Sequence, residues 1–349
     1  MVFAINGTNA LAAVAVSGAA FAEVTITGGF SYGYKTSKSN VAAVTAVDGT
    51  YFDPTNASSP VGQGQTLPAG GTWLVAPVAA VAAGTARASG FGVDTAAITI
   101  AATEDLGGGL TASGSMSLGG LTRGDTPTGE DFKMSLSGGF GTLMLGQIEI
   151  GSGIRGLGTA GAPVNNMEGE VMDAASSGTD IIKYTAPAMG GVTVSASLTE
   201  AKGLGTGSSA GQSKAITVGA VYAANGLTAS LDTTNWDNNA KTYDSRYRIA
   251  AKYDMGVAAV GIGHEDIDNV GTGSTKFTVM GVSVPLGSVT LGAATVTKKV
   301  TGAAKVSGNT IGASYALSKR TSVTANTASW KTAGAVSENK STLLLNHNF

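Results

Sequence analysis

The sequence has no cysteine and few charged residues, and both absences narrow the class of protein. None of the 349 residues is cysteine, which excludes thiol chemistry and a disulfide framework. Only 13% of the residues are charged, about half the usual share, so much of the surface must face something other than water. The net charge of −2 offers no basic face for nucleic acid.

The sequence also lacks a long apolar run. Apart from the N-terminus, no stretch reaches the roughly 18 apolar residues of a transmembrane helix. The 52 glycines show no G-x-y repeat, which excludes collagen. What remains is a glycine-rich chain with little charge and a preference for β-strands.

The first 22 residues differ from the rest of the chain. Residues 10–22 (ALAAVAVSGAAFA) form an apolar run of small residues that ends in Ala20-Phe21-Ala22. Such a run with an A-x-A ending is typical of a secretory signal peptide. We therefore predict an exported protein with a signal peptide at 1–22 and one mature domain at 23–349.

From Glu23 onward, short segments alternate apolar and polar residues with period two, as half-buried strands do. Residues 36–95 are interpreted as a long loop, because Pro77 and the missing alternation disfavour a strand in WLVAPVAAVAAGTA. Sixteen alternating segments are predicted as strands: residues 24–34, 96–104, 110–118, 132–138, 141–147, 181–186, 191–199, 214–223, 226–235, 245–253, 257–266, 274–284, 288–297, 306–316, 320–329 and 341–349.

The links between these segments alternate strictly in length. Seven are short turns, at 105–109, 137–141, 187–191, 223–226, 254–256, 285–287 and 317–319. Eight are longer, at 35–95, 119–131, 148–180, 200–213, 236–244, 267–273, 298–305 and 330–340. An up-and-down barrel with all turns at one end and all loops at the other produces this order, which is the signature of outer-membrane barrels.

Aromatic residues near the short turns support a membrane barrel. They would form a ring at a membrane–water interface: Tyr184, Tyr222, Tyr253, Tyr315 and Phe140. In lipid an open sheet edge leaves backbone groups unpaired, so the last strand must meet the first. With about sixteen strands an aqueous channel remains. We predict an all-β, 16-stranded antiparallel up-and-down transmembrane β-barrel.

Four stretches and the C-terminus resemble the general porins of Gram-negative outer membranes, the proteobacterial trimeric porins. The stretches are EVTITGGFSYGY, DLGGGLTASGSMSL, GGFGTLMLGQ and YALSKRTSVTANTASW, and the chain ends in Phe349. The resemblance implies an outer-membrane homotrimer for passive diffusion of small hydrophilic solutes and ions. It also implies that barrel-assembly machinery reads Phe349.

The link at 149–180 is too long for an ordinary connection. We expect it to fold into the barrel and narrow the channel, as the third loop of porins does. Four acids against one base predict a weak cation preference: Glu149, Glu168, Glu170 and Asp173, with Arg155. Lipid-facing Arg or Lys costs about 2–4 kcal/mol at mid-membrane. Alternation therefore predicts a lumen-facing position for Lys133, Lys183, Arg246, Arg248 and Lys252.

The sequence gives no support for catalysis, a cofactor or a metal site. The only histidines are His264 and His347, and the glycine-rich runs lack the GK[ST] of a phosphate loop. HEDID (264–268) is interpreted as a solvated loop. Its three carboxylates, Glu265, Asp266 and Asp268, lack a full calcium-ligand spacing.

The leading hypothesis is a weakly selective diffusion porin in outer-membrane lipid. A substrate-specific channel is an alternative, but such a channel should have a row of aromatic and arginine side chains along the lumen. The polar faces of the predicted strands are instead mostly serine, threonine, alanine and glycine. A secreted structural or adhesive β-protein is a second alternative, disfavoured because no repeat of 20–50 residues is present.

Overall fold

The structure is a computed structural model of the 349-residue chain. It describes residues 23–41, 49–53, 56–61, 72–75, 84–122, 126–151, 153–165, 167–172, 176–200, 214–237, 243–271 and 273–349. The predicted signal peptide (1–22) lies outside the described residues.

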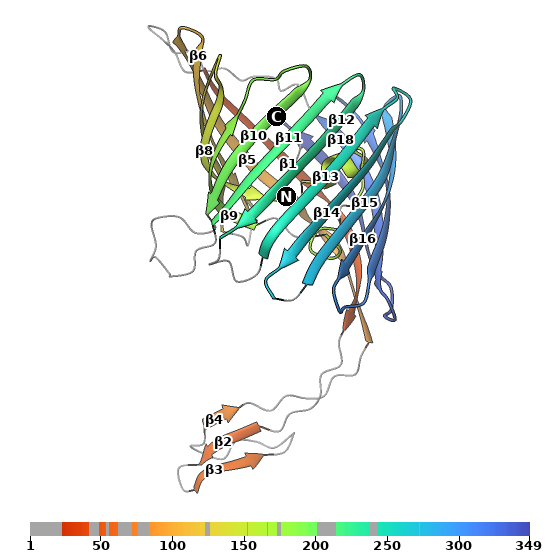
Figure 1. Ribbon diagram of the computed structural model, residues 1–349. Helices are drawn as coiled ribbons and strands as arrows, with labels where there is room; N and C mark the ends of the chain where they lie inside the picture. The colour runs from red at the N-terminus through yellow and green to blue at the C-terminus, as the bar shows by residue number, and fades with distance from the viewer. Residues whose placement is uncertain are drawn as a thin grey trace.

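Sixteen strands form one closed antiparallel barrel (Figure 1). They are β1 (Glu23–Val41), β5 (Gly84–Gly107), β6 (Leu110–Gly119), β7 (Thr128–Gly138), β8 (Gly141–Ile150), β9 (Ser176–Thr185), β10 (Val192–Glu200), β11 (Lys214–Ala224), β12 (Leu227–Trp236), β13 (Tyr243–Asp254), β14 (Ala259–Asn269), β15 (Gly273–Leu286), β16 (Val289–Val300), β17 (Val306–Ala316), β18 (Thr321–Thr332) and β19 (Glu338–Asn348). Each strand pairs with its neighbours in the chain, and β1 pairs with β19 to close the barrel. The predicted fold class and strand number are confirmed.

The predicted long loop at 36–95 is only partly correct. β1 continues to Val41 and β5 already begins at Gly84. Between them, β2 (Gly49–Asp53), β3 (Asn56–Val61) and β4 (Thr72–Val75) form a separate antiparallel sheet in the order β3-β2-β4. The segment TWLV is therefore a strand, because aromatic and β-branched residues favour a pleated sheet, but it is not a strand of the barrel.

The interpretation of HEDID as a loop is wrong. β14 continues through these residues to Asn269, and β15 begins at Gly273. Polar side chains there make cross-strand contacts: Asp266 Oδ2 lies 2.5 Å from Lys276 Nζ, and Ser245 Oγ donates to Asp268 Oδ2 at 2.9 Å. Opposite charges directly across a strand pair stabilise a sheet, so these residues extend the strands instead of ending them.

Large apolar side chains cover the outside of the barrel. Tyr184, Tyr253 and Tyr315 are 42%, 48% and 49% exposed near the short turns, and the Tyr184 hydroxyl donates to the Phe140 carbonyl at 2.5 Å. In the described part of the chain, no helix is long and apolar enough to cross a membrane.

The buried apolar core lies inside the barrel, on one side. It forms between the wall and the link from β8 to β9, residues 151–175, which we call the third loop. Ile154, Met167, Val171 and Met172 of this loop belong to one cluster with wall residues, among them Phe277, Val279, Val296 and Trp330. An inward-facing wall with large apolar side chains is unusual for a barrel lumen, and the loop accounts for it by covering them.

Candidate pore constriction

The third loop lies inside the barrel and carries a short helix, α1 (Arg155–Gly158), against the wall (Figure 1). Its backbone touches glycines of the wall directly. A Cβ added at Gly261 would lie 2.0 Å from the Leu157 carbonyl oxygen, and one added at Gly281 would lie 2.6 Å from the Thr159 Cα. Glycine at such points permits this close approach of two backbones. The predicted inward fold of this loop is confirmed.

The same kind of contact continues across β16 and β17. A Cβ at Gly292 would meet Ala162, one at Gly312 would meet the Pro163 carbonyl, and one at Gly308 would meet the Met167 sulfur. The loop therefore follows the wall from β14 to β17. This half of the interior holds protein and leaves the opposite half for water.

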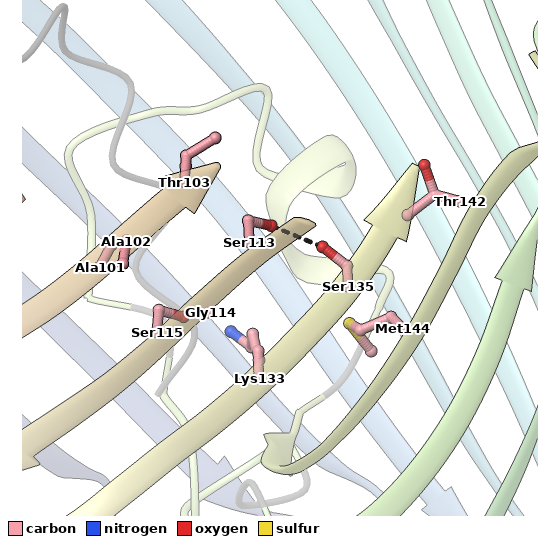
Figure 2. Close-up of a pocket in the computed structure, with 10 residues that line it drawn as sticks. All are labelled: Ala101, Ala102, Thr103, Ser113, Gly114, Ser115, Lys133, Ser135, Thr142 and Met144. Atoms are coloured by element: carbon pink, nitrogen blue, oxygen red, sulfur yellow. Dashed lines mark hydrogen bonds between the residues drawn. The ribbon is translucent and has the colours of Figure 1, made fainter. Parts of the chain in front are cut away.

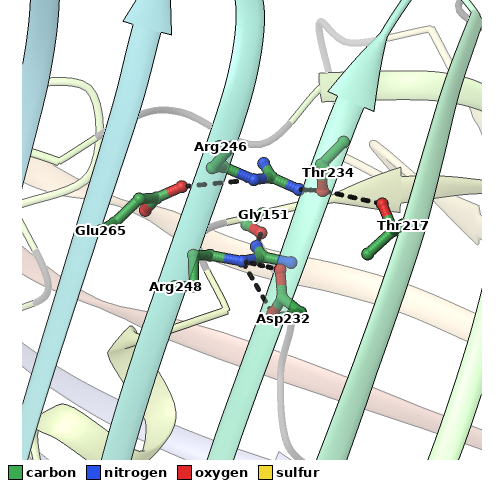
Figure 3. A network of polar contacts seen from close by, with 7 residues as sticks. All are labelled: Gly151, Thr217, Asp232, Thr234, Arg246, Arg248 and Glu265. Carbon is green, nitrogen blue, oxygen red and sulfur yellow. Dashed lines mark hydrogen bonds and ion pairs between the residues drawn. The ribbon is translucent and has the colours of Figure 1, made fainter.

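A second contact fixes the start of the loop to β12 and β13 (Figure 3). Arg248 Nε donates to both carboxylate oxygens of Asp232, at 2.8 and 3.0 Å, and Arg248 Nη1 reaches the Gly151 carbonyl at 3.5 Å. The Nε–H is thus shared between the two oxygens in a charge-assisted contact, which is stronger than a neutral hydrogen bond. Arg248 is thereby positioned to hold the loop where it leaves β8.

Arg246 lies two residues away in the same network (Figure 3). Its Nη2 donates to Thr234 Oγ1 at 3.2 Å, and its Nε lies 3.7 Å from Glu265 Oε1. The guanidinium also lies over the Trp236 ring, 5.4 Å from the centroid. Glu265 is only 1% exposed, so this carboxylate is buried beside an arginine in the barrel wall.

Two of the four predicted acidic residues, Glu168 and Glu170, lie near bases. Glu168 forms an ion pair with Arg155 inside the loop, and Glu170 Oε1 lies 3.8 Å from Lys340 Nζ of β19. At the end of β8, the Glu149 backbone N–H donates to Asp131 Oδ1 at 2.9 Å. Asp173 lies outside the described residues.

The wall that the loop leaves uncovered is lined with hydroxyl groups. A hollow of about 350 Å³ lies on its inner surface, with Ser113 and Ser135 hydrogen-bonded at 2.7 Å (Figure 2). It is lined by Ala101, Ala102, Thr103, Ser113, Gly114, Ser115, Lys133, Ser135, Thr142 and Met144. Short hydroxyl side chains with one lysine make a hydrated, weakly charged surface.

The structure brings some of the predicted basic residues to the loop and leaves others apart. Arg246 and Arg248 lie in the network at its start, and Lys252 Nζ lies beside Gly161, 4.0 Å from where a Cβ would be. Lys133 lines the hollow and pairs with Asp131 at 2.8 Å. Lys183 of β9 lies between the outward-facing Ile182 and Tyr184, 49% and 42% exposed, so strand alternation directs it inward.

The sequence did not single out Asp232, and it did not indicate that Glu265 belongs to this network. The signal that could have found them is the strand register, in which Asp232 and Glu265 both lie directly opposite Arg248. Opposite charges at paired positions of neighbouring strands indicate an interaction.

The histidines and the acidic cluster are not gathered into one site. His264 Nδ1 lies 2.9 Å from Thr278 Oγ1, and His347 Nδ1 lies 3.0 Å from Thr321 Oγ1. Glu265 is buried while its neighbour Asp266 pairs with the exposed Lys276. Among the described residues, no group of three or more His, Cys, Asp or Glu is arranged to hold a metal ion.

Comparison with known proteins gives one family and several similar folds. A family model described as Gram-negative porin matches residues 10–335. No curated protein matches the sequence.

Among solved structures, an anion-selective porin from Comamonas acidovorans is similar over 94% of this chain and 100% of its own, with 19% identity and a TM-score of 0.60. A loop-deletion mutant of the outer-membrane protein OmpT of Vibrio cholerae is similar over 94% and 99%, with 12% identity and a TM-score of 0.58. A triple mutant of Rhodopseudomonas blastica porin is similar over 93% and 100%, with 14% identity and a TM-score of 0.56. At these identities the likeness shows the fold alone.

Proposed function

Because the chain belongs to the Gram-negative porin family, we propose that its barrel is a water-filled channel through which small hydrophilic solutes and ions diffuse passively across the outer membrane. One observation supports this most directly. The third loop packs on one side of the interior, and on the uncovered wall from β5 to β8 a hollow is lined by small side chains, several of them serine and threonine, with one lysine and one methionine. Family membership likewise indicates a channel and not an enzyme.

The cation preference expected from the loop charges is not supported. Five inward or loop acids each lie beside a base, in the pairs Asp131–Lys133, Glu168–Arg155, Glu170–Lys340, Asp232–Arg248 and Glu265–Arg246. Within the described residues, Lys183 and Lys252 have no ion pair that offsets their charge. We infer a weak preference for anions, set by these two lysines together with Lys298, which lies over the inward-facing Phe277 ring, because basic side chains that line a channel favour anions.

The test is single-channel conductance with reversal potentials in a salt gradient. The wild-type protein should form open channels with a small anion preference. Lys183→Gln with Lys252→Gln removes two positive charges and should shift the preference toward cations. Glu168→Gln with Glu170→Gln removes two negative charges and should strengthen the preference for anions. A wild-type channel that prefers cations would contradict the assignment, and a protein without conductance would contradict the channel itself.

The two alternatives receive less support. A secreted structural protein would have no reason for a closed barrel of a porin family. A substrate-specific channel should have a row of aromatic and arginine side chains along the lumen. In the part of the inner wall that the structure describes from β5 to β8, small hydroxyl side chains line the hollow instead.

The oligomer and the export route complete the proposal. The outer face of β1 and β5 carries exposed aromatic residues, and Tyr34 and Phe91 make an edge-to-face contact with ring centroids 5.1 Å apart. We propose that this face joins copies of the chain in a homotrimer, since aromatic residues are enriched in interfaces. Unheated electrophoresis of outer-membrane extracts should show a trimer, and the N-terminal sequence should begin at Glu23; a monomer or an uncleaved chain would contradict the respective proposal.

A further inference from the structure

β5 begins well before the strand that pairs with it on its other side. β1 pairs with β5 along the whole length of β1, with Val41 opposite Gly84. β6 pairs with β5 only from Ile98 onward, and Figure 1 shows β1 and β5 extending past the barrel at the end with the longer loops. Among the described residues, one backbone bond, from the Leu121 N–H to the Ala96 carbonyl, continues the pairing beyond β6. We call residues 84–92 the free edge of β5, because no described strand pairs with them on that side.

The space beside the free edge is open. Residues 84–91 are all exposed, and Phe91 is 76% exposed. A Cβ added at Gly90 or Gly92 would meet no atom within 4 Å. Apart from Arg87 and Phe91, the side chains of this stretch (GTARASGFG) are no larger than threonine. A further strand can therefore approach the free edge without displacing any described part of the chain.

The opposite edge of the same pair of strands is covered. β19 pairs with β1 as far as Lys38, which lies opposite Asn339. Beyond that point, Asn40 Nδ2 donates to the Val336 carbonyl at 2.9 Å and to Glu338 Oε1 at 3.2 Å. Proteins usually cover the edges of their sheets, because unpaired N–H and C=O groups pair readily with other chains. The free edge of β5 is thus the side of this strand pair at which another chain can add.

Two basic side chains lie next to each other on one face of this strand pair. Lys38 is directly opposite Arg87, and Phe91 lies four residues along β5 on the same face. Like charges directly opposite each other destabilise a sheet. The ion pair in this region joins Lys35 to Asp94, and neither Lys38 nor Arg87 has one among the described residues. A strand added at the free edge would place one of its residues beside Arg87, where an acidic side chain would offset the positive charge.

These two charges lie beyond the apolar outer face of the barrel. On β1 that face extends from Val24 to Tyr34, and ten residues of a tilted strand rise about 25 Å, the height of the apolar band on such barrels. Lys38 lies four residues further, roughly 10 Å outside the band. Lipid would also leave the backbone groups of the free edge without partners. A second copy of the free edge fits less well, because residues 84–92 contain no acidic side chain.

From these observations we propose that the free edge of β5 binds an extended acidic peptide segment of a partner protein by strand addition, outside the membrane. In this mode of recognition, main-chain hydrogen bonds supply affinity and the side chains of alternate positions supply specificity. The face described here takes an acidic residue beside Arg87 and an apolar residue beside Phe91, four residues apart on the partner. The proposal goes beyond the channel function and does not depend on conduction.

The fluorescence anisotropy of labelled peptides, mixed with the purified protein in nonionic-detergent micelles, tests the proposal. The acidic probe is a nine-residue peptide of alternating threonine and valine with glutamate and phenylalanine placed four residues apart on one face. The lysine probe has lysine in place of the glutamate. The proline probe keeps the glutamate and the phenylalanine but has prolines at two positions between them, which removes strand hydrogen bonds at equal charge.

The test variant is Arg87→Glu. Its matched control is Arg320→Glu, which makes the same change of charge at an exposed turn residue at the opposite end of the barrel. The wild-type protein should bind the acidic probe more tightly than the lysine probe. Arg87→Glu should bind the acidic probe about fivefold more weakly and should prefer the lysine probe, because an opposite-charge pair across strands becomes a like-charge pair. The control should change by less than about twofold.

Equal binding of the acidic and proline probes would overturn the proposal, because charge alone would then explain the binding. An unchanged order of the probes in Arg87→Glu, or no binding of the acidic probe to the wild-type protein, would also overturn it. Sedimentation of both variants without peptide adds a further check. A smaller oligomer in Arg87→Glu than in Arg320→Glu would overturn the proposal in favour of contact between copies of the chain.

Discussion

At the scale of single residues, the buried carboxylate of Glu265 is the group with the largest energetic consequence. It is 1% exposed and lies 3.7 Å from the Arg246 guanidinium. A charge that loses its partner in a buried position costs several kcal/mol, whereas replacing both partners by apolar residues is often neutral. Loss of one member of the pair should therefore change the free energy of unfolding more than replacement of both members does.

We predict that Arg246→Ala lowers the free energy of unfolding by about 3–5 kcal/mol, since it leaves the Glu265 carboxylate buried without its basic partner. Replacing both residues by leucine should restore most of the loss. Denaturant unfolding in detergent, followed by the heat-modifiable mobility of the barrel, measures both variants. A double variant as unstable as Arg246→Ala would show that the lost charge partner is not the cause.

The inward direction of the basic residues was predictable because a charged side chain that faces lipid is costly. On a strand whose side chains alternate between lipid and lumen, such a residue must therefore face the lumen. The carboxylates that contact these basic residues were not predictable. Asp232 and Glu265 become partners of Arg248 and Arg246 only through the register of three strands. HEDID was misread for a related reason. Consecutive charges resemble a loop unless Lys276 is known to lie opposite Asp266.

At the scale of elements, the third loop depends on residues without side chains. Gly261 and Gly281 lie opposite each other on β14 and β15, and the loop backbone rests on both. Any side chain there would enter space that the loop backbone occupies. The loop position is thus encoded in the wall as well as in the loop.

We predict that Gly281→Val moves the third loop away from the wall, because its Cβ alone would lie 2.6 Å from the Thr159 Cα. Overpacking of this kind destabilises a protein by about 1–3 kcal/mol. We expect the barrel to remain folded despite this cost. Single-channel recordings should show altered and noisier conductance, and proteases should cut the loop faster.

Gly92→Val on β5 is the matched control, because a Cβ at Gly92 meets no atom within 4 Å. It should keep wild-type conductance and protease resistance. Wild-type behaviour of Gly281→Val as well would show that the glycine contacts do not hold the loop.

The inward fold of this loop was predictable from its length and from its place after β8. Which part of the wall the loop covers was not predicted, although the sequence of β15 contains a signal that indicates it. Phe277 and Val279 face the loop while Met280 and Val282 face outward, so both faces of this strand are apolar. A barrel strand without a polar face indicates that something apolar packs on its inner side.

At the scale of the whole molecule, the barrel closes between its first strand, β1, and its last strand, β19. Gly28 and Phe349 exchange backbone hydrogen bonds of 3.1 Å in both directions, and the Phe349 ring lies 5.2 Å from that of Phe30. A Cβ at Gly28 would meet the Phe349 ring at 2.5 Å. The last residue therefore belongs to the seam between β1 and β19.

We predict that Phe349→Ala reduces the amount of assembled barrel in the outer membrane several-fold, because it removes the aromatic contact at the seam and the residue that assembly machinery is proposed to read. Heat-modifiable barrel in membrane fractions measures the effect. Phe349→Tyr keeps the ring and should assemble normally. Equal assembly of Phe349→Ala and the wild-type protein would contradict the role of this residue.

The strand number and the closed barrel were predictable because sixteen segments alternate apolar and polar residues and the fifteen links between them alternate in length. In lipid, an open sheet edge would also leave backbone groups without hydrogen-bond partners. The small sheet of β2, β3 and β4 was not, because short irregular segments carry little periodic signal.

The seam also sets an order of events. β1 is synthesised before every other strand of the barrel, and β19, its partner, is synthesised after them. Until β19 arrives, β1 has an unpaired edge on that side, and its hydrogen-bonding groups are open to other chains. Contacts between such distant segments form slowly, since the intervening chain must first be arranged. The slowest and most aggregation-prone stage of this protein's life should therefore be the interval before Phe349 meets Gly28, and factors that shield the edge of β1 should act in that interval.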